Sequence, residues 1–257
     1  MMKKTFVKEL TQVDLQNPIL IEGLPGLGLV GKICIRYLTK KLKAKRLAHL
    51  YSPHFPYFVL VNKKGSVRLL RGTFHFWKRG GRDDLVFFTG DSQAQTIEGQ
   101  YEISDCILNF AKQKSVKMIV TVGGYRMEAD GKPKVVASAN DEKLLRKALE
   151  AKAVLSSMGS PIVGTAGLIL GLARFSRIDA LCLLGETRGY LPDPKASKSV
   201  LEVLKTMLDL EVDLHDLDEE IEKADQMIAR LQEIEADRAL QTEDMRREQD
   251  KRIRYIS

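Results

Sequence analysis

The sequence contains few residues of the kinds that build disulfide networks or metal centres. It has three cysteines and four histidines among 257 residues. Cys34, Cys106 and Cys182 are far apart, and each lies in an apolar stretch, which favours buried structural thiols over disulfides, metal ligands or a nucleophile. The histidines do not stand at ligand spacing from cysteines or carboxylates. We therefore predict no metal site and a reducing compartment.

Long hydrophobic runs are also absent. The longest apolar stretch, residues 161–173, is interrupted by Gly164, Gly167 and Gly171 and is too short to cross a bilayer. Residues 1–15 are charged and lack the apolar centre of a signal peptide. We therefore expect no membrane anchor and a cytoplasmic protein.

The charge excess is modest and scattered. The chain has 41 Lys plus Arg against 34 Asp plus Glu, a formal net charge of +7, but its basic residues form no block. Zinc-finger spacing and an RNP-type aromatic motif are both missing, so the sequence does not predict nucleic-acid binding. With 44% hydrophobic and 29% charged residues, the composition is typical of a globular protein with a sizeable core.

Short buried strands alternate with amphipathic segments along the first 210 residues. This alternation predicts a three-layer α/β/α domain spanning residues 1–210. The predicted strands are 18–22, 46–51, 57–61, 67–77, 84–89, 117–122, 135–139 and 179–184. The predicted helices are 29–42, 98–112 and 164–173, with one through Leu149 capped by Asn140 or Asp141. Another starts near Lys195 after the rigid turn Pro192-Asp193-Pro194.

Beyond residue 210 the composition changes to a charged, glycine-free segment. Apolar residues recur there with alternating spacings of three and four, which is a heptad seam of about three repeats. We predict a separate charged C-terminal helix and tail over residues 211–257, with the seam serving oligomerisation. The alternative is a surface helix packed back on its own domain. The predicted oligomerisation residues are Leu214, Leu217, Ile221, Ile228 and Leu231.

The last three residues stand out against the charged tail. Tyr255 and Ile256 are an aromatic and an aliphatic residue directly before the terminal Ser257. A carboxylate with such neighbours suits insertion into a pocket of a partner protein. We predict that these residues bind a partner, and the alternative is an ordinary frayed terminus.

A glycine-rich turn follows the first predicted strand. Gly26, Gly28 and Gly31 match the G-x-G-x-x-G pattern that brings backbone amides close to a pyrophosphate. The dinucleotide fingerprint also needs an acid about 20 residues later, but residues 46–53 contain neither Asp nor Glu. We therefore interpret Gly23, Gly26, Gly28 and Gly31 as a structural loop without a cofactor, and a nucleotide-binding enzyme remains the alternative.

No catalytic constellation is visible in the sequence. The Gly-x-Ser-x-Gly motif is absent, and no pair of carboxylates is tied to one helix face by its spacing. We predict that the chain is not an enzyme. The carboxylates that follow predicted strands or lie in loops are Asp91, Glu98, Glu128, Asp130, Glu186 and Asp193.

Four segments together carry a resemblance to a known family. They are Leu20-Ile-Glu-Gly-Leu-Pro-Gly-Leu-Gly-Leu-Val-Gly31, Gly90-Asp-Ser-Gln, Gly164-Thr-Ala-Gly-Leu-Ile-Leu-Gly171 and Leu184-Gly-Glu-Thr-Arg-Gly-Tyr-Leu-Pro-Asp-Pro-Lys-Ala196. In this order they resemble the archaeal branch of the proteasome assembly chaperone family related to the second eukaryotic assembly chaperone.

The resemblance implies an α/β/α fold similar to that of nucleoside phosphorylases, without known catalysis. It also implies a homo-oligomer that binds proteasome α-subunits, with a C-terminal tail docking between them. Some active archaeal members of the family end in hydrophobic-Tyr-any, whereas here Arg254 precedes Tyr255 and Ile256 is penultimate. This difference keeps open a non-chaperone scaffold of the same fold that pairs with another protein.

Overall fold

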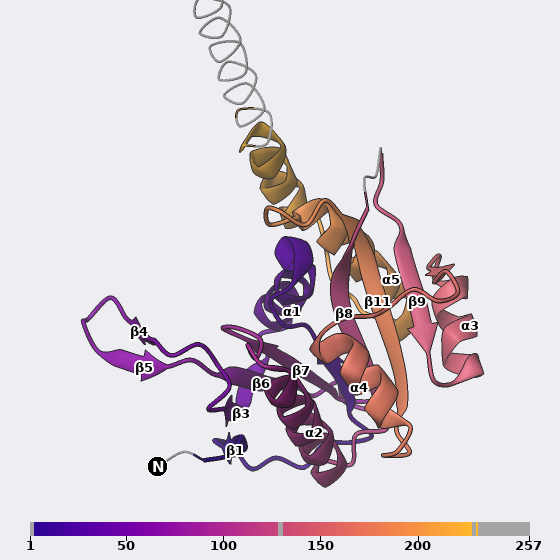
Figure 1. The fold of residues 1–257 in the computed structure, drawn as a ribbon. Coiled ribbons are helices and arrows are strands. Elements are labelled where there is room, and N and C mark those ends of the chain that lie inside the picture. The colour runs from indigo at the N-terminus through magenta and orange to yellow at the C-terminus, as the bar shows by residue number, and fades with distance from the viewer. Residues whose placement is uncertain (1–2, 128–130, 228–229, 231–257) are drawn as a thin grey trace, which may run out of the picture. The chain divides into compact units, whose positions relative to one another are not determined.

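The computed structural model describes residues 3–127, 131–227 and 230 (Figure 1). Contacts between residues divide the chain into two units, residues 1–214 and residues 215–257. The first unit contains the α/β domain. Of the second unit, the structure describes residues 215–227 and 230.

A large mixed sheet forms the centre of the first unit. In the described residues it has nine strands, in the order β1-β3-β6-β7-β2-β8-β11-β9-β10. The strands are β1 (Phe6–Glu9), β2 (Ile19–Glu22), β3 (Lys45–Tyr51), β6 (Gly72–Trp77), β7 (Leu85–Gly90), β8 (Met118–Arg126), β9 (Val135–Ala139), β10 (Val154–Leu155) and β11 (Asp179–Thr187). Strands β7, β2, β8 and β11 are parallel, and β1, β3 and β6 pair antiparallel. The parallel strands are largely apolar in their central residues because both of their faces are covered, and their charged residues stand at or near the strand ends.

Helices cover both faces of the sheet, as Figure 1 shows. They are α1 (Val30–Lys41), α2 (Ile97–Gln113), α3 (Glu142–Glu150), α4 (Thr165–Ala173) and α5 (Pro194–Leu208). Helices α1 and α5 pack together on one face, and α2 and α4 pack together on the other. Helix α3 packs on β9 and contacts α5. The predicted three-layer α/β/α domain is confirmed.

A cluster of aromatic rings fills the layer between the sheet and α2. The ring of Phe74 lies 4.3 Å from that of Phe88 and 4.5 Å from that of Phe110, measured between centroids. Phe74 and Phe88 come from adjacent strands and are fully buried. Such tilted pairs stabilise a core beyond the burial of their area, so this face of the sheet is rigidly packed.

Three helices begin at side-chain caps. Thr96, Asp141 and Asp193 accept hydrogen bonds from the backbone N–H groups three residues later, at the starts of α2, α3 and α5. Pro194 occupies the first turn of α5, where a missing N–H costs nothing. The predicted starts of α3 and α5 are therefore confirmed.

Two strand predictions are wrong. Residues 67–77 do not form one strand, because β5 (Val67–Leu69) pairs with β4 (Val59–Val61) in a separate two-stranded sheet, whereas β6 joins the main sheet. The strand predicted over residues 117–122 ends too early, because β8 continues through Gly123 and Gly124 to Arg126 beside β11. Strand β1 was not predicted, because its Phe-Val-Lys-Glu sequence is half exposed and carries charges.

Both edges of the main sheet are short strands. One edge is β1, with four residues, and the other is β10, with two. Strand β10 pairs only Val154 and Leu155 with β9. The long strands of the sheet all lie inside these edges.

The cysteines are free thiols. Cys34 and Cys182 are buried, and Cys106 is half-buried on α2. Burial raises the pKa of the Cys106 thiol to about 11, helped by the nearby carboxylates of Asp105 and Glu102. All three are therefore protonated packing groups, as expected from the sequence.

The second unit begins with a helix over residues 216–227. Of the predicted seam, Leu214 at the end of the first unit and Leu217 are buried within the chain, and Ile221 is half-buried. Ile228 and Leu231, like Tyr255, Ile256 and Ser257, lie outside the described residues. Within the described residues, no helix has the length and apolarity needed to cross a membrane.

Candidate functional site

The carboxyl ends of the parallel strands gather three connecting segments at one edge of the sheet. The glycine loop, residues 23–31, follows β2; residues 91–96 follow β7; and residues 188–193 follow β11. Open α/β sheets bind ligands at this edge, next to strands whose connecting helices lie on opposite faces. Here α1 follows β2 on one face, and α2 follows β7 on the other, so the glycine loop occupies the position where a ligand would be sought.

Close packing explains glycine at two positions in the loop. A Cβ atom on Gly23 would lie 2.4 Å from the carbonyl oxygen of Gly31, and one on Gly31 would lie 2.3 Å from that of Val122. The loop, the start of α1 and strand β8 therefore touch through their backbones. Any side chain there would push these elements apart.

The middle of the loop is held by the segment after β11. Gly28 has a φ of +58°, and its carbonyl accepts a 2.8 Å hydrogen bond from the N–H of Asp193. The Gly28 N–H donates to the carbonyl of Gly189 at 3.4 Å, and Thr187 donates to the Asp193 carboxylate at 2.7 Å. The N–H of Gly28, a group that could donate to a phosphate in a nucleotide site, is bonded here to the protein's own chain.

Gly26 differs from the other loop glycines. Its backbone is extended, and a Cβ atom there would meet only the side-chain amide of Gln93, at 3.6 Å. Neither packing nor conformation requires glycine at this position. Of the three glycines in the G-x-G-x-x-G match, Gly26 could therefore be replaced by a residue with a side chain, whereas Gly28 and Gly31 could not without strain.

A buried carboxyl group lies beneath the loop. Glu22 ends β2 beside Thr121 of β8 and is only 1% exposed. Its Oε1 atom accepts a 3.0 Å hydrogen bond from the N–H of Leu24, and its Oε2 atom has no partner. Burial raises the pKa of Glu22 to about 8, although the Leu24 hydrogen bond opposes this. Glu22 was not among the predicted site residues. An acid at the end of an otherwise apolar buried strand could have indicated it.

Glutamine side chains tie the loop to the helices on the α2 face. The Gln93 amide donates to the carbonyl of Pro25 at 2.7 Å, and its oxygen accepts from Gln100 at 3.3 Å. Thr165, at the start of α4, donates to Gln100 at 2.8 Å. The polar groups at this edge thus bond to one another across three elements.

The other predicted carboxylates have separate partners. Asp91 binds Arg68, Glu186 accepts from the hydroxyl of Tyr125 at 2.7 Å, and Asp193 caps α5. Glu98 lies exposed on α2, and Glu128 and Asp130 are outside the described residues. The structure does not pair the described ones as an acid and a base.

The histidines occupy different surroundings. Burial lowers the pKa values of His49 and His75 to about 4, and the charge of Arg46 contributes to both shifts. His54 lies 3.3 Å from the Glu102 carboxylate. Among the described residues, no group of three or more His, Cys, Asp or Glu side chains is arranged to hold a metal ion.

The sheet edge at the carboxyl ends of the parallel strands is thus a packed junction between the glycine loop and the helices.

Comparison with known proteins places this architecture in context. Residues 20–232 match the model of the PAC2 family. Among solved structures, Pyrococcus furiosus PbaB, described as an archaeal proteasome activator, is 36% identical, with a TM-score of 0.86 over 90% of this chain and 100% of that one. P. furiosus PbaA, described as an archaeal homologue of a proteasome-assembly chaperone, is 27% identical, with a TM-score of 0.71 over 89% and 96% of the two chains. The uncharacterized protein MJ1210 of Methanocaldococcus jannaschii is 29% identical over 91% of both chains.

Proposed function

Because the chain belongs to the PAC2 family, we propose that it binds proteasome α-subunits as an oligomeric assembly chaperone or activator in the cytoplasm. The observation that carries this proposal is the similarity to PbaB, a proteasome activator, which extends over 90% of this chain at 36% identity. The similarity to PbaA, a homologue of an assembly chaperone, points to the same class of partner.

In this proposal the contacts with α-subunits come from the domain surface and from the C-terminal tail. Tyr255, Ile256 and Ser257 supply an aromatic group, an aliphatic group and a carboxylate that suit a pocket in a partner. The preceding segment is rich in charged residues, and the apolar seam that includes Ile221, Ile228 and Leu231 serves self-association.

The proposed activity needs neither catalysis nor a cofactor. Support comes from the glycine loop, where Gly28 is bonded to Gly189 and Asp193 of the same chain. A panel of nucleotides and nucleosides should therefore leave the melting temperature unchanged. A ligand at 100 times its Kd would instead stabilise the fold by about 2.7 kcal/mol, and such a shift would favour a nucleotide-binding enzyme.

The decisive experiment is co-elution with archaeal proteasome α-subunits, followed by native mass spectrometry of the complex. The full chain should co-elute, and a chain lacking residues 251–257 should not, while keeping its own oligomeric mass. A variant with Lys251→Ala and Arg252→Ala is the matched control, because it changes the tail but keeps Tyr255, Ile256 and Ser257. Unchanged co-elution after truncation would reject the tail mechanism.

A second candidate is an oligomeric scaffold of the same fold that pairs with another protein. The order Arg254-Tyr255-Ile256 favours it, because Tyr255 is third from the end instead of penultimate. A full chain that shows no co-elution with α-subunits would support the scaffold. Recovery of α-subunits as the main partner in a pull-down counts against it.

A further inference from the structure

The two-stranded sheet of β4 and β5, here called the β4–β5 ribbon, turns an apolar face to solvent. In its register Val59 lies opposite Leu69, and Val61 lies opposite Val67, so these four side chains share one face. Their exposed fractions are 46%, 51%, 67% and 63%, in the order just named. An antiparallel ribbon with one solvated face normally puts polar residues there, so this pattern is reversed.

The other face of the ribbon is fixed to its own domain. Leu60 packs against the hydrophobic core, and Arg68 lies opposite it in the register. The Arg68 guanidinium donates to both carboxylate oxygens of Asp91, at 2.6 and 2.9 Å. Because one face is anchored by these contacts, the aliphatic face is held outward.

Hydrogen bonds of Asn62 also define the turn of the ribbon. The side-chain oxygen of Asn62 accepts hydrogen bonds from the N–H groups of Lys64 and Ser66, at 2.9 and 3.1 Å. Gly65 has a φ of +81°, which suits this turn. The ribbon projects from the domain as a formed element (Figure 1), which lowers the entropy cost of binding.

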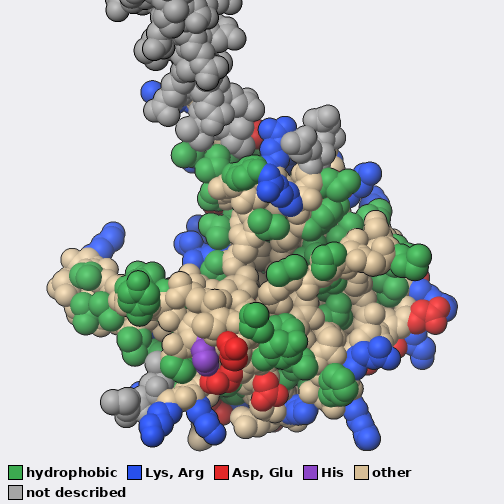
Figure 2. Space-filling view, in the orientation of Figure 1, with side chains coloured by type: hydrophobic (Ala, Val, Ile, Leu, Met, Phe, Trp, Pro, Cys, Tyr) green, Lys and Arg blue, Asp and Glu red, His purple; other side chains and the backbone are tan. Residues whose placement is uncertain are grey.

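The exposed apolar surface continues beyond the four aliphatic side chains. Tyr57 and Phe58, just before β4, are 101% and 55% exposed. Figure 2 shows hydrophobic side chains gathered on this projecting part of the molecule. A gathering of exposed apolar side chains of this kind marks a protein contact.

Helix α2 carries a second unusual surface, with apolar and acidic side chains together. Ile97 and Tyr101 are 75% and 51% exposed, and Glu98 and Asp105 are exposed beside them. Spacings of four residues place Ile97, Tyr101 and Asp105 on one helix face. In Figure 2 red and green side chains lie together over this region.

We infer that the β4–β5 ribbon of one copy of the chain docks on this face of α2 in a second copy. Both surfaces expose large apolar groups, and their charges are opposite: Lys63 and Lys64 lie in the turn of the ribbon, and Glu98 and Asp105 lie on α2. Because the two surfaces differ, the contact is head-to-tail, and its repetition forms a ring if the rotation between neighbouring copies closes. The inference supplies a contact for the proposed homo-oligomer and does not depend on proteasome binding.

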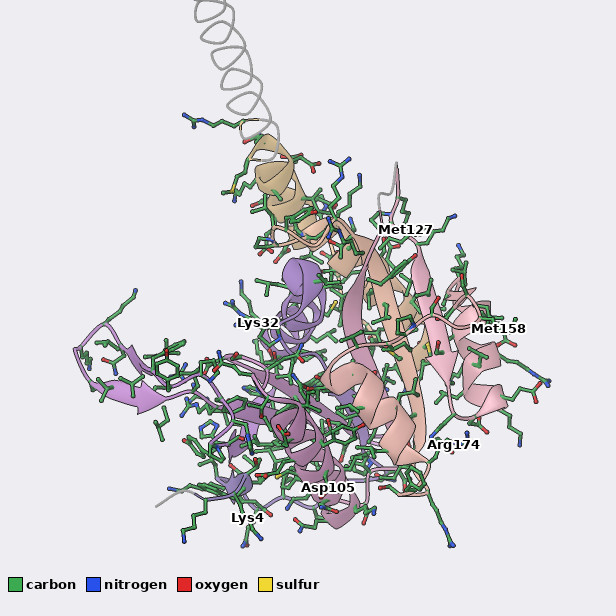
Figure 3. The ribbon with its side chains drawn as sticks, viewed as in Figure 1. Lys4, Lys32, Asp105, Met127, Met158 and Arg174 are labelled. Atoms are coloured by element: carbon green, nitrogen blue, oxygen red, sulfur yellow. The ribbon has the colours of Figure 1, made fainter. Side chains whose placement is uncertain are left out.

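Two variants separate the halves of this contact. The ribbon variant carries Val61→Asp and Val67→Asp, and the α2 variant carries Ile97→Asp and Tyr101→Asp. All four positions are at least half exposed, so both variants should keep the wild-type circular dichroism spectrum. Met158→Asp is the control, because Met158 is 102% exposed and lies away from Asp105 of α2 (Figure 3).

Sedimentation velocity and native mass spectrometry then give the masses. The wild-type chain and the Met158→Asp control should assemble fully, and each docking variant alone should have a smaller mass than the wild type, because only the C-terminal seam is left to join its copies. An equimolar mixture of the two variants should form species larger than either variant alone, because one intact ribbon and one intact α2 face remain.

Three results would overturn the inference: a monomeric wild type, a docking variant that assembles like the wild type, or a mixture whose mass is no larger than that of either variant alone. A docking variant that assembles normally but no longer co-elutes with α-subunits would show that this surface binds α-subunits and not a second copy of the chain. Loss of α-subunit binding by the tail truncation tests the proposed function separately, so failure of one idea is distinguishable from failure of the other.

Discussion

Arg68 and Asp91 join the β4–β5 ribbon to the main sheet through two hydrogen bonds of 2.6 and 2.9 Å between guanidinium and carboxylate. The Asp91 carboxylate also accepts a 3.0 Å bond from the N–H of Arg71. Burial alone would raise the pKa of Asp91, but the hydrogen bonds from Arg68 and Arg71 hold this pKa below its usual value. Asp91 thus holds both the base of the ribbon, through Arg68, and the segment that leads into β6, through Arg71.

Arg68→Ala should loosen the ribbon without unfolding the domain. The bidentate pair is partly exposed, so its loss should cost only about 1 kcal/mol. Hydrogen exchange measured by mass spectrometry should rise at least several-fold over residues 57–70 and stay unchanged in α2. Arg82→Ala, which removes the exposed ion pair with Asp209, is the matched control. Unchanged exchange over the ribbon would show that the Arg68 pair does not hold it.

Gly31→Ala should destabilise the domain strongly. The new Cβ would lie 2.3 Å from the Val122 carbonyl oxygen, and relieving that overlap requires backbone movement costing about 2 kcal/mol or more. Gly26→Ala, whose Cβ meets nothing closer than 3.6 Å, should change stability little. Urea unfolding of both variants tests the difference, and equal midpoints would refute the packing explanation of the loop.

Glu22→Gln should flatten the dependence of stability on pH. The folded-state pKa is about 8, against an ordinary value of 4.5, so between these values the folded chain keeps a proton that the unfolded chain loses. The contribution of Glu22 to stability should therefore fall by about 1.4 kcal/mol per pH unit as the pH rises through this window. In denaturant unfolding from pH 5 to 8, the stability of the wild type relative to Glu22→Gln should fall with this slope, and its stability relative to an exposed Glu142→Gln control should stay constant. Identical slopes in all three proteins would contradict the assignment.

His75→Gln should reduce sensitivity to acid. The pKa of His75 is lowered from 6.5 to about 4 by burial and by Arg46, and its Nδ1 atom has no hydrogen-bond partner. The unfolded chain protonates His75 at a higher pH than the folded chain does, so the contribution of His75 to stability should fall as the pH drops from 6.5 towards 4. Thermal melts in this range should show a weaker decline for His75→Gln than for the wild type. The exposed His215→Gln control should behave like the wild type; an equal decline in His75→Gln would be inconsistent with a buried neutral imidazole.

The layered fold was predictable because its signals are local. Buried apolar strands, the Pro192-Asp193-Pro194 turn and the Asp141 cap each have a short sequence pattern with one favoured structure. The β4–β5 ribbon was not predictable in this way. Its second strand is followed directly by Leu70 and Arg71, without a strong turn signal, so residues 67–77 read as one strand. Which sheet a strand joins depends on long-range pairing that local preference does not encode.

The candidate site was predictable only in part. The glycine loop was identified, and its close contacts with Val122 and Thr187 explain two of the constrained positions. These contacts join segments almost 100 or more residues apart in the chain, so no spacing rule could have revealed them. The outward apolar face of the ribbon likewise depends on the register between Val61 and Val67, which only the paired strands define.

The brevity of the outermost strands has a consequence for how copies of this protein can meet. Strand β10 offers two residues and β1 offers four, so another backbone finds few free amides to extend the sheet, and fibre-like growth is discouraged. Association is thereby left to side chains, whose shapes and charges discriminate among partners. A protein with large exposed apolar groups can then stay selective in crowded surroundings.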